Sequence, residues 1–359
     1  MIHSNTRQGA SALKIIRQWV MGASALALAA LAAPVAAQTA CAPGSPQLIV
    51  YHAGSLTAAF SQVEKLFTQQ TGICVLDVSA GSVDLARRVT AGGEACDIYA
   101  SADFEDIDVL LKPAGFARYN IIFAQGGMVL AYTTGSRNAA TIAAPGDFNP
   151  PASVPDAADD WYLQLTRPGV TVGSSHPFLD PSGYRAHMIF ELTEDHYRAP
   201  NLYDTLLTHY VLTRPTDALG KTYDYQIIYE HSALAAYIAD ATKSYRFVRL
   251  PDDVGLADPE KNRVYGKAGV IMPGLRVPRT ASSVRIPATR VQWGLTILNN
   301  APNHENAVKF LQLLFGAQGV AMQAATGPAP VSPPLVSHED FRDLPPSLRS
   351  VVKVERRDQ

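Results

Sequence analysis

Short, mostly apolar runs alternate with serine-containing turns along the first third of the chain. The runs cover residues 48–51, 74–78 and 97–99, and they lead into His52-Ala-Gly-Ser55, Ser79-Ala-Gly-Ser82 and Ala100-Ser-Ala-Asp103. After the first turn, apolar residues recur at steps of four, three and four, at Leu56, Phe60, Val63 and Phe67. That spacing places them on one helical face. The pattern predicts buried strands followed by helices, with N-caps at Ser55, Ser82 and Ser101.

The predicted elements alternate regularly between strand and helix. Strands are expected over residues 47–52, 73–79 and 96–100, and helices over 55–70, 82–91 and 103–112. This alternation is typical of an α/β fold built on doubly wound parallel sheets. Strands at 128–132 and 291–297 bracket the middle of the chain and are candidate crossings between two lobes. We predict a lobe I over 45–128 plus 295–345, a lobe II over 129–294, and a C-terminal tail over 346–359.

The turns that follow the predicted strands carry candidate chemistry. Parallel strands end at one edge of a sheet, where helix N-termini expose unpaired N–H groups and the positive ends of helix dipoles. Such an edge binds anions without Lys or Arg. The alternative interpretation of each single Gly-Ser turn is ordinary strand-to-helix turn chemistry. Two similar Ala-Gly-Ser turns, ending at Ser55 and Ser82, favour the anion site.

The middle of the chain adds polar residues at a helix start and a strand end. Asp180 followed by Pro181 has the form of an N-cap with proline at the first helical position, ahead of a helix over 184–193. A strand that begins at Tyr225 ends in the polar segment Tyr229-Glu-His-Ser232. Taken alone, Asp180 is more simply a helix cap than a ligand. His52 and His231 at strand ends are better interpreted as polar cleft-rim residues than as an acid/base pair.

The N-terminus has the form of an export signal. Arg7, Lys14 and Arg17 precede an uncharged run over residues 20–33 and a small-residue cleavage site near Ala37. The run is too short and alanine-rich to favour a transmembrane span. Removal of residues 1–37 makes the formal charge, −2 for the whole chain, more negative by three. A mildly acidic exported protein argues against nucleic acid or an anionic membrane surface as partner.

The three cysteines leave several possibilities open. Cys41 lies ahead of the first predicted strand, Cys74 opens the second, and Cys96 opens the third. An exported chain can oxidise a pair, and a bridge between the neighbouring strand starts at Cys41 and Cys74 is possible. Lipid attachment at Cys41 is disfavoured because Gln38-Thr-Ala40 lacks the usual apolar residue. A metal site is disfavoured at the cysteines because no His or second Cys lies at ligand spacing.

Seven motifs in order resemble one known family. In chain order they are HAGSLTAAF from His52, SAGS from Ser79, DIYASAD from Asp97, VLAY from Val129, DWY from Asp160 with a later RPGV, DPSGYR from Asp180 and LNNAP from Leu298. In this order they resemble the extracellular solute-binding proteins of ABC importers for molybdate and tungstate. The resemblance spans roughly residues 45–335.

The resemblance implies a two-lobed periplasmic binding protein of type II, with a two-strand hinge and a tetrahedral oxyanion in the interlobe cleft. The implied protein is a periplasmic monomer that delivers molybdate or tungstate to a membrane permease, with no cofactor, no nucleic acid and no catalysis. The residues implied in ligand binding are Ser55, Ser82, Asp180, Gly183, Tyr184, Tyr229 and Glu230. In the tungstate branch, two carboxylates, here Asp180 and Glu230, approach the bound metal and raise its coordination from four toward six.

The chain departs from the family pattern at the second carboxylate. Alignment without a gap puts Ile228 at that position, and a short shift brings in Glu230, which we favour because strand ends face the cleft. The same fold binding sulfate or another small anion is the alternative function. An exported hydrolase that uses a Gly-Ser turn is a distant alternative, because no Gly-x-Ser-x-Gly motif is present. Arg185 either pairs with the anion or ties down a carboxylate such as Asp180.

Overall fold

The computed structural model describes residues 41–42, 44–275 and 283–355. The described chain lies within one compact unit that begins at residue 40. The predicted export signal over residues 1–37 lies outside the described residues. None of the helices in the described ranges is long and apolar enough to cross a membrane.

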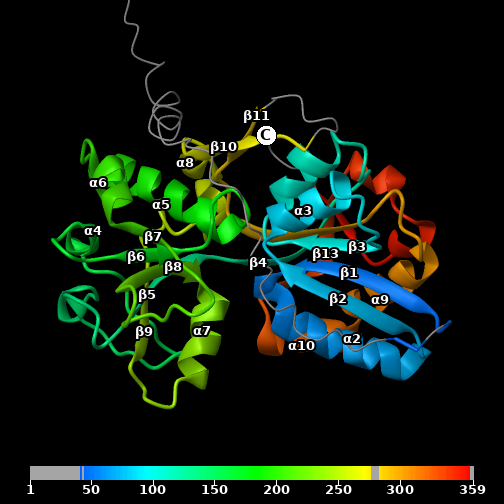
Figure 1. Ribbon diagram of the computed structural model, residues 1–359, viewed down its shortest axis with the longest axis horizontal. Helices are drawn as coiled ribbons and strands as arrows, with labels where there is room; N and C mark the ends of the chain where they lie inside the picture. Colours follow the sequence, from blue (N-terminus) through cyan, green and yellow to red (C-terminus); the bar gives the residue numbers. More distant parts are fainter. Residues whose placement is uncertain (1–40, 43, 276–282, 356–359) are drawn as a thin grey trace, which may run out of the picture. The chain divides into compact units, whose positions relative to one another are not determined.

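A seven-stranded sheet is formed by residues from both ends of the described chain. Its strand order is β14-β13-β4-β12-β3-β1-β2, and β1 pairs in parallel with both β2 and β3 (Figure 1). Helices α2, α9 and α10 contact one another beneath the sheet, whereas α3 lies on its other side. The strands are β1 (Gln47–Ala53), β2 (Cys74–Ala80), β3 (Ile98–Ser101), β4 (Ile121–Gly126), β12 (Val291–Ile297), β13 (Ala329–Ser337) and β14 (Lys353–Glu355). The helices are η2 (Gly54–Leu56), α2 (Thr57–Thr71), α3 (Ser82–Thr90), η3 (Asp106–Leu111), α9 (His304–Phe315), α10 (Ala317–Thr326), η6 (Asp340–Asp343) and η7 (Pro346–Leu348).

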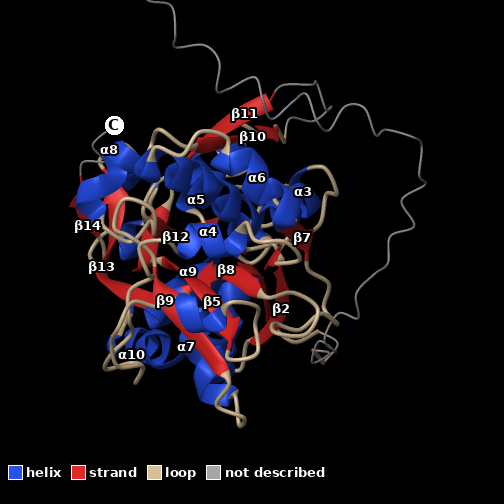
Figure 2. Cartoon of the chain, turned by 90° about the vertical axis from the view of Figure 1, so that its left-hand side faces the viewer, coloured by secondary structure: helices blue, strands red, loops and turns tan. Residues whose placement is uncertain are grey.

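A five-stranded sheet is formed by the middle of the chain, with the order β7-β6-β8-β5-β9. Helices α5 and α6 lie on one side of this sheet and α7 on the other (Figures 1 and 2). The strands are β5 (Met128–Thr133), β6 (Val172–Ser174), β7 (Tyr210–Leu212), β8 (Tyr225–Tyr229) and β9 (Tyr245–Arg249). The helices are η4 (Ala139–Thr141), α4 (Trp161–Leu165), α5 (Pro181–Tyr197), α6 (Leu202–His209), α7 (Glu230–Ala239), η5 (Pro259–Lys261) and α8 (Asn262–Tyr265). A separate antiparallel pair consists of β10 (Gly269–Pro273) and β11 (Ser283–Pro287).

The predicted α/β fold class is confirmed, and the crossings fall close to the expected strands. Strands β4 and β5 belong to different sheets although only Gly127 separates them. Two backbone hydrogen bonds hold the crossings to one loop: Met128 N–H donates to Gly255 O, and Val291 N–H donates to Leu256 O. The division into lobes at the predicted residues stays a prediction. The segment predicted as a tail from residue 346 contains η7 and β14, and Leu348 is buried.

The three predicted serine N-caps, at Ser55, Ser82 and Ser101, are wrong. Helix α2 begins at Thr57 after the short turn η2, and the cap residue of α3 is Gly81, with no side-chain cap bond at either helix. Ser101 lies in β3, although its hydroxyl does accept a hydrogen bond from the N–H of Asp103. The hydroxyls of Ser55 and Ser82 bond to distant parts of the chain instead, as described below. The predicted cap at Asp180 is confirmed, because its carboxylate accepts the N–H of Ser182 and Pro181 occupies the first turn.

A disulfide bond fastens the start of β2 to the segment before β1. It joins Cys41 to Cys74, whose Cα atoms are 5.8 Å apart. The third cysteine, Cys96, is a buried free thiol. Of the pairings that the sequence left open, the structure has the bridge between neighbouring strand starts.

Candidate functional site

The carboxyl ends of three parallel strands meet at one edge of the seven-stranded sheet. The register pairs Ala53 with Ala80 and His52 with Ala100, so the turns after β1, β2 and β3 are neighbours. The hydroxyl of Ser82, which is fully buried, accepts the N–H of Ala102 at 3.0 Å. The hydroxyl proton of Ser82 can therefore be donated to an anion at this edge. The first N–H groups of helix α3 also begin here, as predicted.

The start of α3 lies against the loop that precedes α5. Asp84 N–H donates to Leu179 O at 3.1 Å, and the Arg87 guanidinium donates to Phe178 O at 2.7 Å. Gly81 permits this approach, because a Cβ at that position would lie 2.4 Å from Leu179 O. The turn after β2 and the loop before α5 are thus in direct backbone contact.

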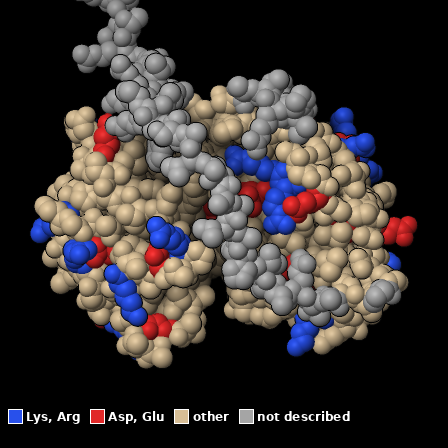
Figure 3. Space-filling model, viewed as in Figure 1, with Lys and Arg blue, Asp and Glu red and all other residues tan. Residues whose placement is uncertain are grey.

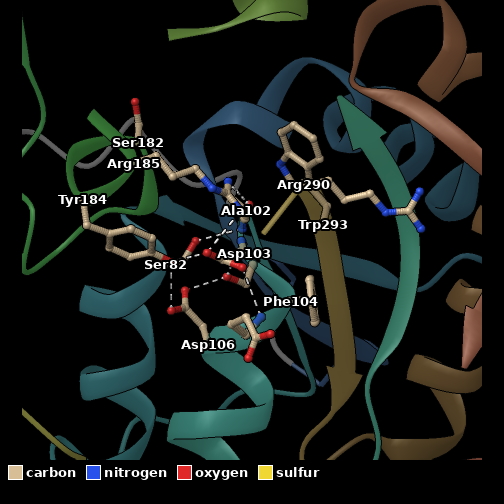
Figure 4. Close-up of polar contacts among 12 residues, drawn as sticks. Ser82, Ala102, Asp103, Phe104, Asp106, Ser182, Tyr184, Arg185, Arg290 and Trp293 are labelled. Atoms are coloured by element: carbon tan, nitrogen blue, oxygen red, sulfur yellow. Dashed lines mark hydrogen bonds and ion pairs between the residues drawn. The ribbon is translucent and has the colours of Figure 1, made fainter. Parts of the chain in front are cut away.

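Two side chains of α5 reach the turn after β3. The Tyr184 hydroxyl donates to an Asp103 carboxylate oxygen at 2.7 Å, and the Arg185 guanidinium lies 3.1 Å from the same oxygen (Figure 4). Arg185 also donates to Ala102 O at 2.7 Å and to the Tyr229 hydroxyl at 3.0 Å. These groups are almost completely buried. One buried polar network therefore joins the seven-stranded sheet to α5 and β8.

The network keeps the guanidinium of Arg185 charged and balances it with the carboxylate of Asp103. Burial opposes the charged guanidinium, but Asp103 and the neighbouring tyrosines raise the pKa of Arg185 above its ordinary value. Burial, and then the charge of Asp103, raises the pKa of Asp106 well above its ordinary value. Asp106 accepts a hydrogen bond from the Ser101 hydroxyl at 2.7 Å. Arg185 therefore ties down a carboxylate, but that carboxylate is Asp103 and not Asp180.

An aromatic cluster surrounds Ser55. The Trp293 indole N–H donates to the Ser55 hydroxyl at 2.9 Å, and a His231 ring nitrogen lies 3.0 Å from Ser55 O. The rings of Tyr229 and Trp293 are 4.9 Å apart between centroids. Burial lowers the pKa of His231 to about 4, so this imidazole is neutral at pH 7. Residues of η2, β8, α7 and β12 are thereby packed around the first serine turn.

The structure brings six of the seven predicted site residues to one region, because Asp180 also lies against Gly81, next to Ser82. Ser82, Tyr184 and Tyr229 are joined through the Arg185 network, and Ser55 contacts the same cluster through Trp293. Asp180 and Gly183 lie at the start of α5, where a Cβ on Gly183 would lie 2.4 Å from Ser175 O. Burial raises the pKa of Asp180, against the opposing effect of the Ser182 N–H.

The side chain of Glu230 makes a different contact from the other predicted site residues. It begins α7, its side chain is 39% exposed, and its carboxylate lies 3.4 Å from the Arg249 guanidinium. Ile228, the other candidate for the second carboxylate position, packs in a small apolar cluster with Val129 and Phe247. Neither residue places a second carboxylate beside Asp180, and the role of each in ligand binding stays a prediction.

Asp103, Asp106 and Trp293 were not predicted as site residues. Asp103 and Tyr184 are separated by 81 positions, so no local pattern indicates their hydrogen bond. The available signal was the polar end of the third predicted strand, where Ala-Ser101-Ala-Asp103 parallels the two Ala-Gly-Ser turns. Trp293 lies in β12, and all seven residues of that strand are buried. The sequence pattern therefore indicated a core residue at this position.

The surface charge agrees with the composition. On the face shown in Figure 3, Lys and Arg side chains gather near the middle, but Asp and Glu side chains lie beside them. The prediction that the partner is neither nucleic acid nor an anionic membrane surface rests on the same balance of 30 basic and 32 acidic residues.

Comparisons with known proteins agree with this geometry. Residues 48–327 match the family model described as bacterial extracellular solute-binding protein. A solute-binding protein of Petrotoga mobilis is 31% identical over 297 residues, which are 80% of this chain and 85% of that relative. The molybdate/tungstate-binding protein WtpA of Pyrococcus abyssi is 29% identical over 342 residues, covering 86% of this chain and 90% of that relative.

A solved structure supports the fold. The sulfate-binding protein SubI from Mycobacterium tuberculosis H37Rv aligns with 80% of this chain and 87% of its own, at 17% sequence identity and a TM-score of 0.52. The two-sheet arrangement is accordingly that of periplasmic binding proteins, and the predicted resemblance is confirmed. The chain therefore belongs to the bacterial extracellular solute-binding protein family.

Proposed function

We propose that this protein captures a tetrahedral oxyanion, molybdate or tungstate, between its two sheets for delivery to the permease of an ABC importer. The contact between the strand-end turns and α5 carries the proposal, because it brings Ser82, Tyr184 and Tyr229 into one buried network. The similarity to proteins named for molybdate and tungstate binding supports the choice of ligand.

The chemistry of the network suits a dianion held by neutral donors. Arg185 is compensated by Asp103, so hydroxyls and helix N–H groups supply the remaining attraction. The hydroxyls of Ser55 and Ser82 lie at the edge of the seven-stranded sheet, whereas the Tyr229 hydroxyl lies at the end of a strand of the five-stranded sheet. A ligand that contacts both groups stabilises the arrangement in which they are close. The Tyr184 hydroxyl already donates its proton to Asp103, so its part is to hold that carboxylate in place. Lobes over 45–128 plus 295–345 and over 129–294 are the bodies that we propose to close.

The second carboxylate determines how the ligand is bound. In the six-coordinate mode, Asp180 and Glu230 would both approach the metal of the oxyanion. Glu230 instead lies beside Arg249 and is more than one-third exposed. This observation favours four-coordinate binding and keeps sulfate as the second candidate ligand, since sulfur offers no metal to coordinate. X-ray absorption on the tungstate complex distinguishes four oxygen neighbours from six.

The remaining parts of the proposal follow from the family. We propose that the mature protein is a periplasmic monomer that returns its ligand chemically unchanged. The predicted export signal over residues 1–37 and the mildly acidic composition support this placement. Incubation with molybdate followed by recovery of unaltered ligand tests the non-enzymatic role.

Calorimetric titration of the exported protein tests the function. Molybdate, tungstate, sulfate and phosphate are titrated in turn, and we expect binding with the first two. Ser82→Ala removes a buried hydroxyl and should weaken affinity at least tenfold, roughly the effect of one charge-assisted hydrogen bond. Ser61→Ala is the matched control, because its hydroxyl bonds only within α2, to Thr57 O. Absence of binding to all four anions, by heat and by thermal shift, would refute the proposal.

A further inference from the structure

A compact group of three potential metal ligands lies outside the buried network of Ser82, Asp103, Tyr184, Arg185 and Tyr229. His52 on β1, Glu64 on α2 and Asp77 on β2 each place one ligand atom within 4.8 Å of the others. His52 Nε2 is 2.7 Å from an Asp77 oxygen. His52 is completely buried, Glu64 is 7% exposed, and the Asp77 side chain is 32% exposed. One imidazole and two carboxylates therefore converge from three different elements.

Glu64 has no interaction in the fold that explains its burial. Its Oε1 atom is buried and has no hydrogen-bond partner, and no Lys or Arg forms an ion pair with it among the described residues. A buried carboxylate without a partner is costly. Ionisation of Glu64 is opposed first by burial and then by the carboxylate of Asp77, whose ligand atom lies within 4.8 Å, and the pKa of Glu64 is raised to about 8. A cation between these groups would remove both penalties.

The orientation of His52 favours metal binding. Its Nδ1 atom lies 2.8 Å from Ala53 O, and a carbonyl oxygen can only accept, so Nδ1 carries the proton. Nε2 points at the carboxylates and, without a metal, donates a second proton to Asp77 at 2.7 Å; a bound cation would take the place of that proton. Zinc-binding histidines commonly have this arrangement, with the outer ring nitrogen donating to a backbone carbonyl. The Phe60 ring, 5.0 Å away between centroids, packs against the imidazole and limits its rotation.

We propose that His52, Glu64 and Asp77 form a binding site for one divalent transition-metal cation, with Zn²⁺ as the representative ion. Zinc accepts one imidazole nitrogen and two carboxylate oxygens at about 2.0–2.2 Å, so the ligand atoms need to move only slightly toward a common centre. Two carboxylates neutralise the charge of the ion. The partial exposure of Asp77 leaves a fourth position for water and a path for entry.

The site would act as a clamp on the start of the first lobe. It joins α2 to β1 and β2, and β2 is already fastened at its other end by the Cys41–Cys74 disulfide. His52 also lies three residues before Ser55, so the ion would fix the end of β1 that leads into the first serine turn. The ligands belong to none of the groups proposed to hold the oxyanion, so the two sites share no residue.

Zinc titration of the exported, tag-free protein tests the proposal. The protein is first treated with a chelator and dialysed, and Zn²⁺ alone is then added in calorimetry, with bound metal counted by mass spectrometry. We expect one equivalent of Zn²⁺ and a higher melting temperature of the loaded protein. Co²⁺ in place of Zn²⁺ should give the visible absorption of a tetrahedral nitrogen and oxygen site.

Three variants separate a specific site from surface binding. Glu64→Gln and Asp77→Asn keep the side-chain shapes and should each weaken Zn²⁺ binding at least tenfold. Asp253→Asn is the matched control, because Asp253 forms an ordinary pair with His196 at 3.5 Å and belongs to no three-ligand group within the described chain. It should bind Zn²⁺ as the parent does. Circular dichroism verifies that each variant is folded.

Three results would overturn the proposal. The first is less than one equivalent of Zn²⁺ bound to the parent protein. The second is unchanged affinity in both Glu64→Gln and Asp77→Asn. The third is loss of binding in Asp253→Asn, which would place the ion at His196.

Discussion

The ion pair between Asp103 and Arg185 makes the sharpest prediction about stability. Both side chains are at most 2% exposed, and their charged atoms are 3.1 Å apart. Arg185→Met or Asp103→Asn leaves the other charge buried without its partner. Breaking a buried pair in this way costs about 3–5 kcal/mol of unfolding free energy. Each single variant is therefore expected to lose that much.

The double variant should lose much less unfolding free energy than the sum of the two single losses. With Arg185→Met and Asp103→Asn together, no uncompensated charge remains at this position, and replacement of a whole buried pair is often close to neutral. If the double variant loses no more than one single variant, the interaction energy in the double-mutant cycle is at least about 3 kcal/mol. The Tyr184 hydroxyl, 2.7 Å from the Asp103 carboxylate, retains an acceptor in the asparagine variant.

Urea unfolding followed by circular dichroism measures the four free energies of the cycle at pH 7. Tyr203→Phe is a suitable control for removal of a polar contact in the same body, because its hydroxyl bonds only to the His187 ring at 3.2 Å. If the two single losses add to the double loss within about 0.5 kcal/mol, the pair is not coupled and the reasoning fails.

Three further predictions concern pH, close packing and the disulfide. Burial lowers the pKa of His187 to about 4, so the folded protein holds this imidazole neutral. The free energy of unfolding should therefore fall as the pH drops below about 6.5, by about 2 kcal/mol at pH 5. Urea unfolding should show a smaller loss in His187→Phe, and an equal loss would contradict the assignment. Gly81→Ala places a Cβ against Leu179 O and should weaken oxyanion affinity at least tenfold by calorimetry, whereas Gly54→Ala, with 4.0 Å to the nearest atom, should not. The Cys41→Ser, Cys74→Ser double variant opens a bridge across 33 positions and should lose about 2–4 kcal/mol in urea, and no loss would show that the unfolded state is unaffected by the link.

The parallel strands and their turns could be predicted from the sequence because they depend on local order. Apolar runs of three to five residues, followed by helical spacing, define β1, β2 and β3 to within two residues of the observed starts. The same local logic gave the cap at Asp180, where the carboxylate reaches an N–H only two residues away. The edge that these turns form was therefore visible before the structure.

Long-range partners could not be predicted in this way. The serine caps fail because Ser55 and Ser82 find donors on β12 and after β3, and a tertiary partner competes with the local one. The role of Arg185 was left open, since the sequence offered Asp180 nearby while the fold supplies Asp103. Glu64 and Asp77 are each unremarkable in sequence, and only the pairing of β1 with β2 and the packing of α2 against the sheet bring them to His52.

The two crossings between the sheets share a single anchor. The N–H groups of Met128 and Val291 bind the adjacent carbonyls of Gly255 and Leu256, and Gly127 lies against Ala257. Two strands pinned side by side to one loop leave the bodies that they connect little freedom except to swing about that line. Loading and unloading would then follow one coordinate, and a single pair of fluorescent labels, one on each sheet, would report the occupancy of the protein directly.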